Sequence, residues 1–169
     1  MAQAAKTKTA AEDKDKRDAV QVIAVNNKVY HDYLIRDTVE AGLVLTGTEI
    51  KSIRAGRVNL REAYARADSG ELWLHNMHIA PYEAGDLWNP QIPTRNRKLL
   101  LHRGQIKELS RQTRAKGLTL VPVRLYIIRD RAKIELALAQ GKKIYDKRQA
   151  MAEKEANRDI ERAVRARHR

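Results

Sequence analysis

The chain of 169 residues contains no cysteine and no phenylalanine. Without cysteine it can form neither disulfides nor metal sites built on thiolates. Without phenylalanine, the aromatic bulk of a core has to come from the six tyrosines and two tryptophans. Apolar runs such as LVL and LLL are far too short to span a bilayer, and the first residues lack the apolar region of a secretory signal. We therefore expect a soluble, cytoplasmic protein.

Patterns of catalytic or metal-binding residues are also scarce. The chain has no glycine-rich phosphate loop. Its one close histidine pair, His75 and His78, has an i,i+3 spacing that points to opposite faces of a strand. We predict no metal, no cofactor and no enzymatic activity. A nuclease or RNA-modifying enzyme with dispersed catalytic residues is the weakest of the alternatives that stay open.

Positive charge, by contrast, is abundant: 34 Lys and Arg face 21 Asp and Glu, which gives a net charge of +13. Residues 20–140 contain nineteen of the basic and twelve of the acidic side chains, so the body of the protein is basic as well as its end. Such a field favours polyanions, of which nucleic acid is the most common. A membrane surface is the second possibility, but a basic amphipathic segment with Trp, Phe or Leu on one face is missing.

The basic residues gather in four clusters, which together indicate contacts with an RNA or DNA backbone, although each alone is typical of a solvated face. The clusters are Lys51, Arg54 and Arg57; Arg95, Arg97 and Lys98; Arg103, Lys107, Arg111, Arg114 and Lys116; and Lys142, Lys143, Lys147 and Arg148. Several aromatic side chains could stack on bases, and several must belong to the core. The candidates for stacking are Tyr30, Tyr33, Tyr64, Tyr82, Trp88 and Tyr145.

Short segments rich in β-branched and aromatic residues predict a mainly β body. The expected strands lie within residues 20–27, 29–35, 41–45, 60–67, 71–80, 119–127 and 133–139. Alternation predicts that Val121, Val123, Leu125 and Ile127 share one face, and that Ile134, Leu136 and Leu138 share another. Pro122 indicates an edge strand or a bulge. Turns are expected at Asp68-Ser69-Gly70 and at Arg129-Asp130-Arg131.

Two helices interrupt the strands. Thr46 and Glu49 have the spacing of a capping box, and Gly56 is placed to end that short helix. Its inward residues would be Ile50 and Ile53, and its flank would carry Lys51 and Arg54. Residues 103–116 predict a mostly charged helix, with Ile106 and Leu109 inward and Gly117 at its end.

The economical architecture is a small antiparallel OB-fold-like barrel of about six strands with two or three short helices. A split-sheet α+β fold is the alternative. Residues 1–25 are expected to be mostly disordered, residues 26–140 to form the barrel, and residues 141–169 to form a basic tail.

The tail carries ten Lys and Arg against five Asp and Glu, and its apolar residues form no continuous stripe. It therefore lacks the face that would dock it onto a core. Opposite charges nevertheless lie at helical spacing, in the pairs Glu155–Arg158, Asp159–Arg162 and Glu161–Arg165. We expect a tail that is disordered when free and helical against a negative partner, with a purely solubilising tail as the alternative.

Five strings, in order, resemble the bacterial SsrA-binding protein family, also called small protein B. They are EAGLVLTGTEIKSIRAG (40–56), NMHIAPYE (76–83), TRNRKLLLH (94–102), KGLTLVPVRLY (116–126) and ELALAQGKKIYDKR (135–148). The resemblance covers residues 26–148. It implies an OB-fold barrel that binds the tRNA-like domain of tmRNA (SsrA RNA), one protein per RNA. It further implies delivery of that RNA to stalled ribosomes for trans-translation, in which incomplete proteins are tagged.

The resemblance also implies site residues. Those that fall where the family contacts tmRNA are Asn26, Glu40, Leu100 and Lys133, joined by Lys51 and Arg54. Those of the tail, which enters the small-subunit decoding centre and the mRNA channel, are Gly141, Lys142, Lys143, Tyr145, Asp146, Lys147 and Arg148. Tyr145 departs from relatives that have His there, although its ring could still stack on a base. A generic OB-type RNA chaperone or ribosomal protein is the competing interpretation.

Overall fold

The structure is a computed structural model that describes residues 20–82, 92–114 and 117–143. Predictions for Tyr145, Asp146, Lys147 and Arg148, for the rest of the tail and for residues 1–19 lie outside the described residues. The strands are β1 Gln21–Val25, β2 Tyr33–Leu43, β3 Val58–Asn59, β4 Tyr64–Asp68, β5 Glu71–His75, β6 His78–Ile79, β7 Arg97–Leu100, β8 Leu118–Ile128 and β9 Arg131–Gly141. The helices are α2 Lys28–Asp32, α3 Gly47–Arg54 and α4 Arg103–Thr113.

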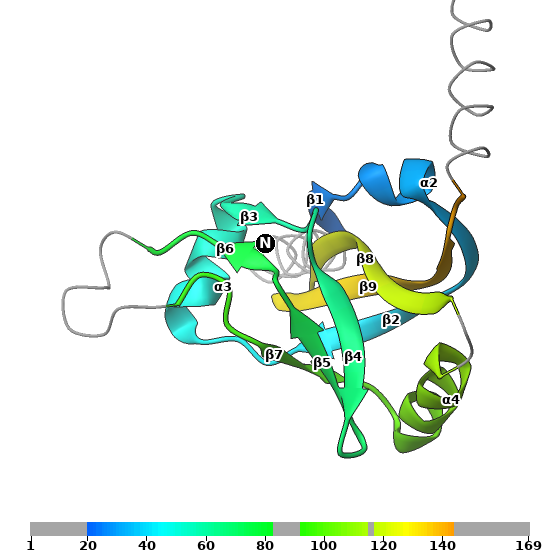
Figure 1. The fold of residues 1–169 in the computed structure, drawn as a ribbon. Helices are drawn as coiled ribbons and strands as arrows, with labels where there is room; N and C mark the ends of the chain where they lie inside the picture. Colours follow the sequence, from blue (N-terminus) through cyan, green and yellow to red (C-terminus); the bar gives the residue numbers. More distant parts are fainter. Residues whose placement is uncertain (1–19, 83–91, 115–116, 144–169) are drawn as a thin grey trace, which may run out of the picture.

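Six of these strands form a closed antiparallel barrel (Figure 1). Around the ring the order is β8, β4, β5, β7, β2 and β9, and the pairing of β8 with β9 closes it. β1 pairs with β8 outside the ring, and β3 pairs with β6 in a separate ribbon. The predicted antiparallel OB-fold-like barrel is thereby confirmed. β1 also adds residues 21–25 to the sheet, which the predicted boundary at residue 26 leaves out.

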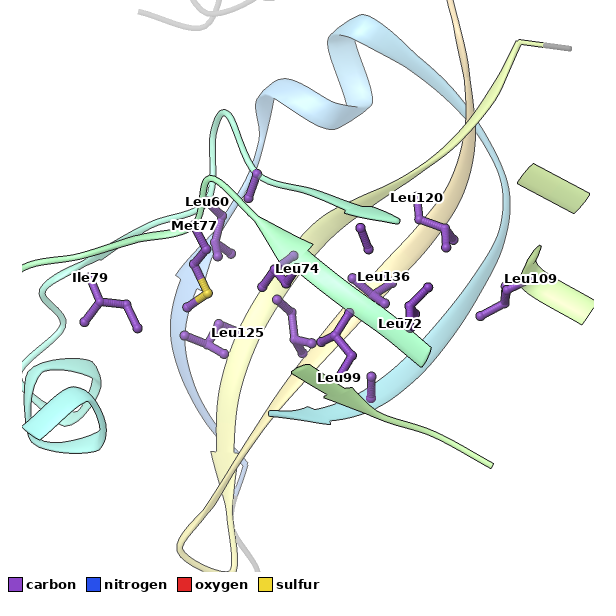
Figure 2. Close-up of a cluster of buried hydrophobic side chains, with 14 of the residues drawn as sticks. Leu60, Leu72, Leu74, Met77, Ile79, Leu99, Leu109, Leu120, Leu125 and Leu136 are labelled. Atoms are coloured by element: carbon purple, nitrogen blue, oxygen red, sulfur yellow. The ribbon is translucent and has the colours of Figure 1, made fainter. Parts of the chain in front are cut away.

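The interior of the barrel is packed with aliphatic side chains (Figure 2). Leu72, Leu74, Leu120, Leu125 and Leu136 are fully buried there, and each contributes about 1.5–3 kcal/mol by leaving water. The inward face predicted for β9 is confirmed, since Ile134, Leu136 and Leu138 all belong to this cluster. Within the described residues the cluster includes no aromatic side chain. The tyrosines of the described chain therefore lie outside this cluster.

A β-bulge in β8 changes which residues face the core. The register of β8 against β9 shifts between Pro122 and Arg124, so Val123 is the extra residue. Leu125 and Ile127 point into the barrel, whereas Val121 and Val123 belong to a second cluster on its outer face. The bulge expected from Pro122 is confirmed. The prediction that all four residues share one face is wrong, because the bulge interrupts the alternation.

The prediction of a strand over residues 29–35 is wrong for its first half. Residues 28–32 form the short helix α2, and β2 starts at Tyr33 and continues through residues 41–43 as one strand of eleven residues. Val29 of this helix is buried against Val121, Val123 and two alanines of β9. Packing onto that outer patch outweighs the β propensity of the segment.

The predicted helix starts and turns are largely confirmed. The Thr46–Glu49 capping box is present, and Gly56 ends the helix with φ of +72°. Ile53 is buried as expected, but Ile50 is only half-buried, because Glu49 and Ser52 take the inward positions instead. Ile106 and Leu109 are the buried residues of α4, and both predicted hairpin turns contain residues with positive φ.

Candidate nucleic-acid interface

Three of the predicted RNA-binding residues meet on the outer face of three neighbouring strands. Gly42 of β2 lies opposite Leu100 of β7 on one side and opposite Lys133 of β9 on the other. Glu40 lies two residues along β2 and therefore points to the same side as Gly42. We call this surface the Glu40 face, and its residues are Glu40, Gly42, Leu100, Tyr126 and Lys133.

Gly42 leaves a furrow in the middle of the Glu40 face. A side-chain Cβ at this position would lie 3.3 Å from the Cβ of Leu100. Because glycine has none, a groove of about 460 Å³ opens between Leu100, Lys133 and the start of α3. Leu100 is 52% exposed, whereas its neighbour Leu99 on the same strand is buried. The groove is therefore lined by the apolar side chain of Leu100 and by the ammonium group of Lys133.

Glu40 organises the polar side of the face. Its carboxylate accepts hydrogen bonds from the ammonium of Lys133 and from the hydroxyl of Tyr126. These two hydrogen bonds, that of Lys133 first, hold the pKa of Glu40 below its ordinary value. Burial and the bond to Glu40 raise the pKa of Tyr126, so its hydroxyl stays protonated. At neutral pH the face presents an ionised carboxylate that fixes the position of an ammonium group.

Arg124 extends the face beside Tyr126, and sequence reasoning assigned neither of these two residues to RNA. Arg124 forms an ion pair with Glu135, which lies opposite Glu40 in the sheet. The Arg124 guanidinium also lies 5.8 Å from the centre of the Tyr126 ring. Tyr126 lies between Leu125 and Ile127, which point inward, so the strand pattern alone could have placed it on the outer face.

Lys51 and Arg54 are exposed on α3, as predicted, but they do not contact Glu40 or Lys133. Arg54 forms an ion pair of 3.3 Å with Asp130 in the turn between β8 and β9. The Lys51 ammonium lies 5.4 Å from the ring centre of Tyr82. Both side chains belong to a helix whose first residues line the groove of the Glu40 face. They therefore border this surface and do not form its centre.

Asn26 lies elsewhere and is buried, with 3% of its surface exposed. Its side-chain amide donates hydrogen bonds to the carbonyl oxygens of Leu60 (3.0 Å) and Pro122 (3.3 Å). Its backbone N–H donates to Val123 at 2.7 Å. These bonds tie the corner between β1 and α2 to the bulge of β8, so the contacts of Asn26 in the described chain are structural.

The first residues of the tail are held at the end of β9 that is far from Lys133. Gly141 pairs with Tyr33, and the backbone N–H of Lys142 donates to Asp32 at 2.9 Å. The Lys142 ammonium donates to the carbonyl of Tyr30 at 3.1 Å, and Lys143 follows on the surface. Figure 1 shows this end of β9 beside α2. Gly141 is eight residue steps along β9 from Lys133, which corresponds to about 26 Å.

One basic cluster has a structural role that sequence reasoning missed. Arg97 is completely buried and donates to Glu49 (2.9 Å) and to the carbonyls of Met77 and Pro93 (2.5 and 2.9 Å). Arg95 donates to both carboxylate oxygens of Glu49, at 2.8 and 2.5 Å. Burial alone would raise the pKa of Glu49, but Arg95, the Thr46 N–H and the charge of Arg97 lower it. Arg97 therefore cannot reach RNA.

Metal sites and membrane-spanning helices are both absent from the part of the chain that the structure describes. Residues 20–82, 92–114 and 117–143 hold no group of three His, Cys, Asp or Glu suited to a metal ion. In the same ranges, no helix has the length and apolar character that crossing a membrane requires.

Known proteins resemble this chain over most of its length. A family model described as SmpB protein matches residues 23–166. An SsrA-binding protein of Carboxydothermus hydrogenoformans is 59% identical over 148 residues, which cover 88% of this chain and 99% of the relative. One of Streptococcus pneumoniae is 55% identical over 146 residues, covering 86% and 94%.

A solved structure is also similar. It is a chain described as "tmRNA-SmpB: a journey to the center of the bacterial ribosome", with a TM-score of 0.62 and 48% identity. The match covers 73% of the present chain and 85% of that chain.

Proposed function

The chain belongs to the SmpB protein family, and from this premise we propose that it is a non-catalytic adaptor that binds the tRNA-like domain of tmRNA. The adaptor delivers this RNA to stalled ribosomes in the cytoplasm, one protein per RNA. Translation then resumes on the reading frame of the RNA, and the incomplete protein is tagged. The relatives are named for binding SsrA RNA, and the similar solved chain is described with tmRNA and the ribosome.

The main support for the proposal is that Leu100, Gly42 and Lys133 lie side by side on three neighbouring strands, next to Glu40. The ammonium of Lys133 has donors left for a phosphate after its bond to Glu40. The furrow at Gly42, with Leu100 as its wall, suits a ribose or a base. Carboxylate oxygens of Glu40 can accept from a 2′-hydroxyl, which distinguishes RNA from DNA. The face thus combines backbone neutralisation with contacts that depend on RNA.

The basic tail would act at the ribosome. We propose that Tyr145, Asp146, Lys147 and Arg148 enter the decoding centre and the mRNA channel, and that the tail from residue 141 becomes helical there. Ordering a free tail costs about 1–2 kcal/mol per residue. A channel already filled by message would deny the contacts that offset this cost. The docking of Lys142 beside α2 supports the proposal, because it gives the tail a defined starting direction.

The test of RNA binding compares two lysine variants at several salt concentrations. Lys133→Met removes the cation of the Glu40 face. Lys28→Met is the matched control, because it removes an exposed cation of α2 that also pairs with a carboxylate, that of Glu62. We expect Lys133→Met to weaken binding of the tRNA-like domain of tmRNA and to reduce the salt slope by about 0.9. The control should leave both quantities unchanged. Equal effects of the two substitutions would contradict a specific role of this face.

A truncation after Lys143 separates the adaptor from a general RNA chaperone. It retains the contacts that Lys142 makes with α2. The adaptor should keep its affinity for tmRNA and lose tagging of incomplete proteins in a translation extract. A chaperone should instead lose mostly affinity, since the tail would contribute only charge.

A further inference from the structure

α2 lies between the Glu40 face and the first residues of the tail. It has only five residues, Lys28–Asp32, and no side chain caps its N-terminus. A helix this short has no stability of its own in water. Its position therefore depends on the tertiary contacts at its two ends and on its one buried side chain.

The buried side chain of α2 packs on the outer face of β8 and β9. Val29 is 2% exposed and contacts a patch made by Val121, Val123 and two alanines of β9. This patch continues the Glu40 face directly, because Val123 precedes Arg124 in β8 and the two alanines follow Glu135 in β9. A shift of α2 on the patch would therefore be a shift relative to the Glu40 face.

The N-terminal end of α2 is tied to the bulge of β8 by one buried residue. The side-chain amide of Asn26 donates to the carbonyl of Pro122 at 3.3 Å, and its backbone N–H donates to that of Val123 at 2.7 Å. The carbonyl of Asn26 in turn accepts from the N–H of Val29 at 3.2 Å. Asn26 thus links the bulge to the first turn of the helix.

The C-terminal end of α2 is capped by the start of the tail. The last carbonyl oxygens of a helix have no partner within the helix itself. Two of them accept hydrogen bonds from Lys142: that of Asp32 from the backbone N–H at 2.9 Å, and that of Tyr30 from the ammonium at 3.1 Å. Figure 1 shows α2 and the last residues of β9 at the same end of the barrel. The direction of the chain after Lys142 therefore depends on where α2 lies.

We propose that Val29 and Asn26 are positioning residues, which act through α2 and Lys142 to set the direction in which the tail leaves the barrel. The direction is set relative to the Glu40 face, so the adaptor presents its two functional parts in one fixed arrangement. A tail that starts in another direction meets its target less often in a productive geometry, at unchanged affinity for RNA. The inference rests on the proposed function only in taking the Glu40 face as the RNA side and the tail as the ribosome side.

The first experiment is a double-mutant cycle, with tagging of incomplete proteins in a translation extract as its readout. Val29→Ala in the full-length protein should lower the maximal tagging rate about fivefold, within the range known for residues that couple two sites. It should leave the affinity for the tRNA-like domain of tmRNA unchanged. In the Lys142→Met background, Val29→Ala should have no further effect, because α2 acts through Lys142. Lys142→Arg, which keeps the cation, should tag as the wild type does.

The matched control is Leu109→Ala on α4. Leu109 is a buried aliphatic residue, like Val29, but it belongs to the cluster inside the barrel and not to the patch under α2. This control should lower the melting temperature at least as much as Val29→Ala does. Assayed well below all melting temperatures, it should leave tagging unchanged, which separates loss of position from loss of stability.

The second experiment uses the free protein and is independent of the proposed function. Because the chain has no cysteine, spin labels can be attached only where cysteines are introduced, as Lys107→Cys on α4 and Gln149→Cys in the tail. Pulsed electron paramagnetic resonance then measures the distribution of distances between the two labels. This distribution should shift or broaden in both Val29→Ala and Lys142→Met, and it should stay as in the wild type in Lys142→Arg.

The proposal is overturned if Val29→Ala tags as the wild type does, or if its effect adds fully to that of Lys142→Met. A loss of tmRNA affinity in Val29→Ala would also overturn it, because α2 would then serve RNA binding itself. Unchanged label distances in both variants would overturn it as well. If instead the distances shift while Lys133→Met leaves tmRNA binding intact, the adaptor function fails and the positioning role of α2 stands.

Discussion

Replacing Glu49 by glutamine should destabilise the barrel more than any surface substitution of the same kind. The substitution keeps the shape of the side chain and removes its charge. Arg97 would then retain a fully buried guanidinium whose remaining described partners are backbone carbonyls. Arg95 would lose its ionic partner as well, but this side chain is 33% exposed and water can replace part of the interaction.

The size of the effect follows from burial. Removing one partner of a buried ion pair costs about 3–5 kcal/mol, because the other charge stays uncompensated. Since the amide oxygen introduced by Glu49→Gln could still accept one bond from Arg97, we expect a loss near the lower end, about 3 kcal/mol. For a domain of this size the melting temperature would fall by roughly 10 °C. The control is Glu71→Gln, which breaks the exposed pair with Lys98 and should cost less than about 1 kcal/mol.

The assay is urea unfolding, followed by circular dichroism and tryptophan fluorescence, as a function of pH. The pKa of Glu49 is lower in the folded protein than its ordinary value of 4.5. Its ionised form therefore stabilises the fold above pH 4.5, and this contribution disappears as the pH falls through the folded pKa. The difference in unfolding free energy between wild type and Glu49→Gln should shrink in that range. A small loss at neutral pH, equal to that of Glu71→Gln, would refute the reasoning, as would a difference that does not change with pH.

Three further predictions concern the Glu40 face, Asn26 and the tail base. Lys133→Met should raise the pKa of Glu40, and Tyr126→Phe should raise it less, because the Lys133 hydrogen bond is the larger cause; carboxyl NMR titration measures both, and an unchanged pKa contradicts the contact. Asn26→Ala should destabilise the protein by about 1–3 kcal/mol in urea unfolding, because two buried carbonyls lose their donor; no loss would show that water replaces it. Lys142→Met should change stability by less than about 1 kcal/mol and leave the affinity for tmRNA intact. Tagging of incomplete proteins in a translation extract should decrease. Normal tagging would show that the contact of the Lys142 side chain with α2 is not needed.

Local patterns predict the fold well wherever neighbouring residues alone decide the structure. The Thr46–Glu49 box, the two hairpin turns and the inward face of β9 depend on spacing within a few residues. The pattern is misleading at Val123, because a bulge shifts the alternation by one residue. It is misleading again at Val29, where the partner that stabilises the helix lies more than ninety residues away, around Val121. In both places a tertiary contact outweighs local preference.

The candidate site is less accessible to local reasoning. Glu40, Leu100 and Lys133 share no pattern in the chain, and only the register of three strands brings them together. Their prediction comes from the resemblance to a family. The clustering of basic residues also wrongly assigns Arg97 to the RNA-binding surface. The strand pattern indicates otherwise: Arg97 lies two residues before Leu99 on β7, so a strand that buries Leu99 also points Arg97 inward.

β9 imposes a constraint on how this protein can change. Lys133 lies two residues after the start of β9 and Gly141 lies at its end, and because eight positions separate them both are on the outer face of the barrel. Inserting one residue between them would turn the side chains at one end of the strand to the opposite face of the sheet. Inserting two would restore the original face but push the tail base outward by about 6.6 Å. Unless a bulge such as the one at Val123 absorbs a single residue, the distance between Lys133 and the tail base can therefore change only in steps of two residues.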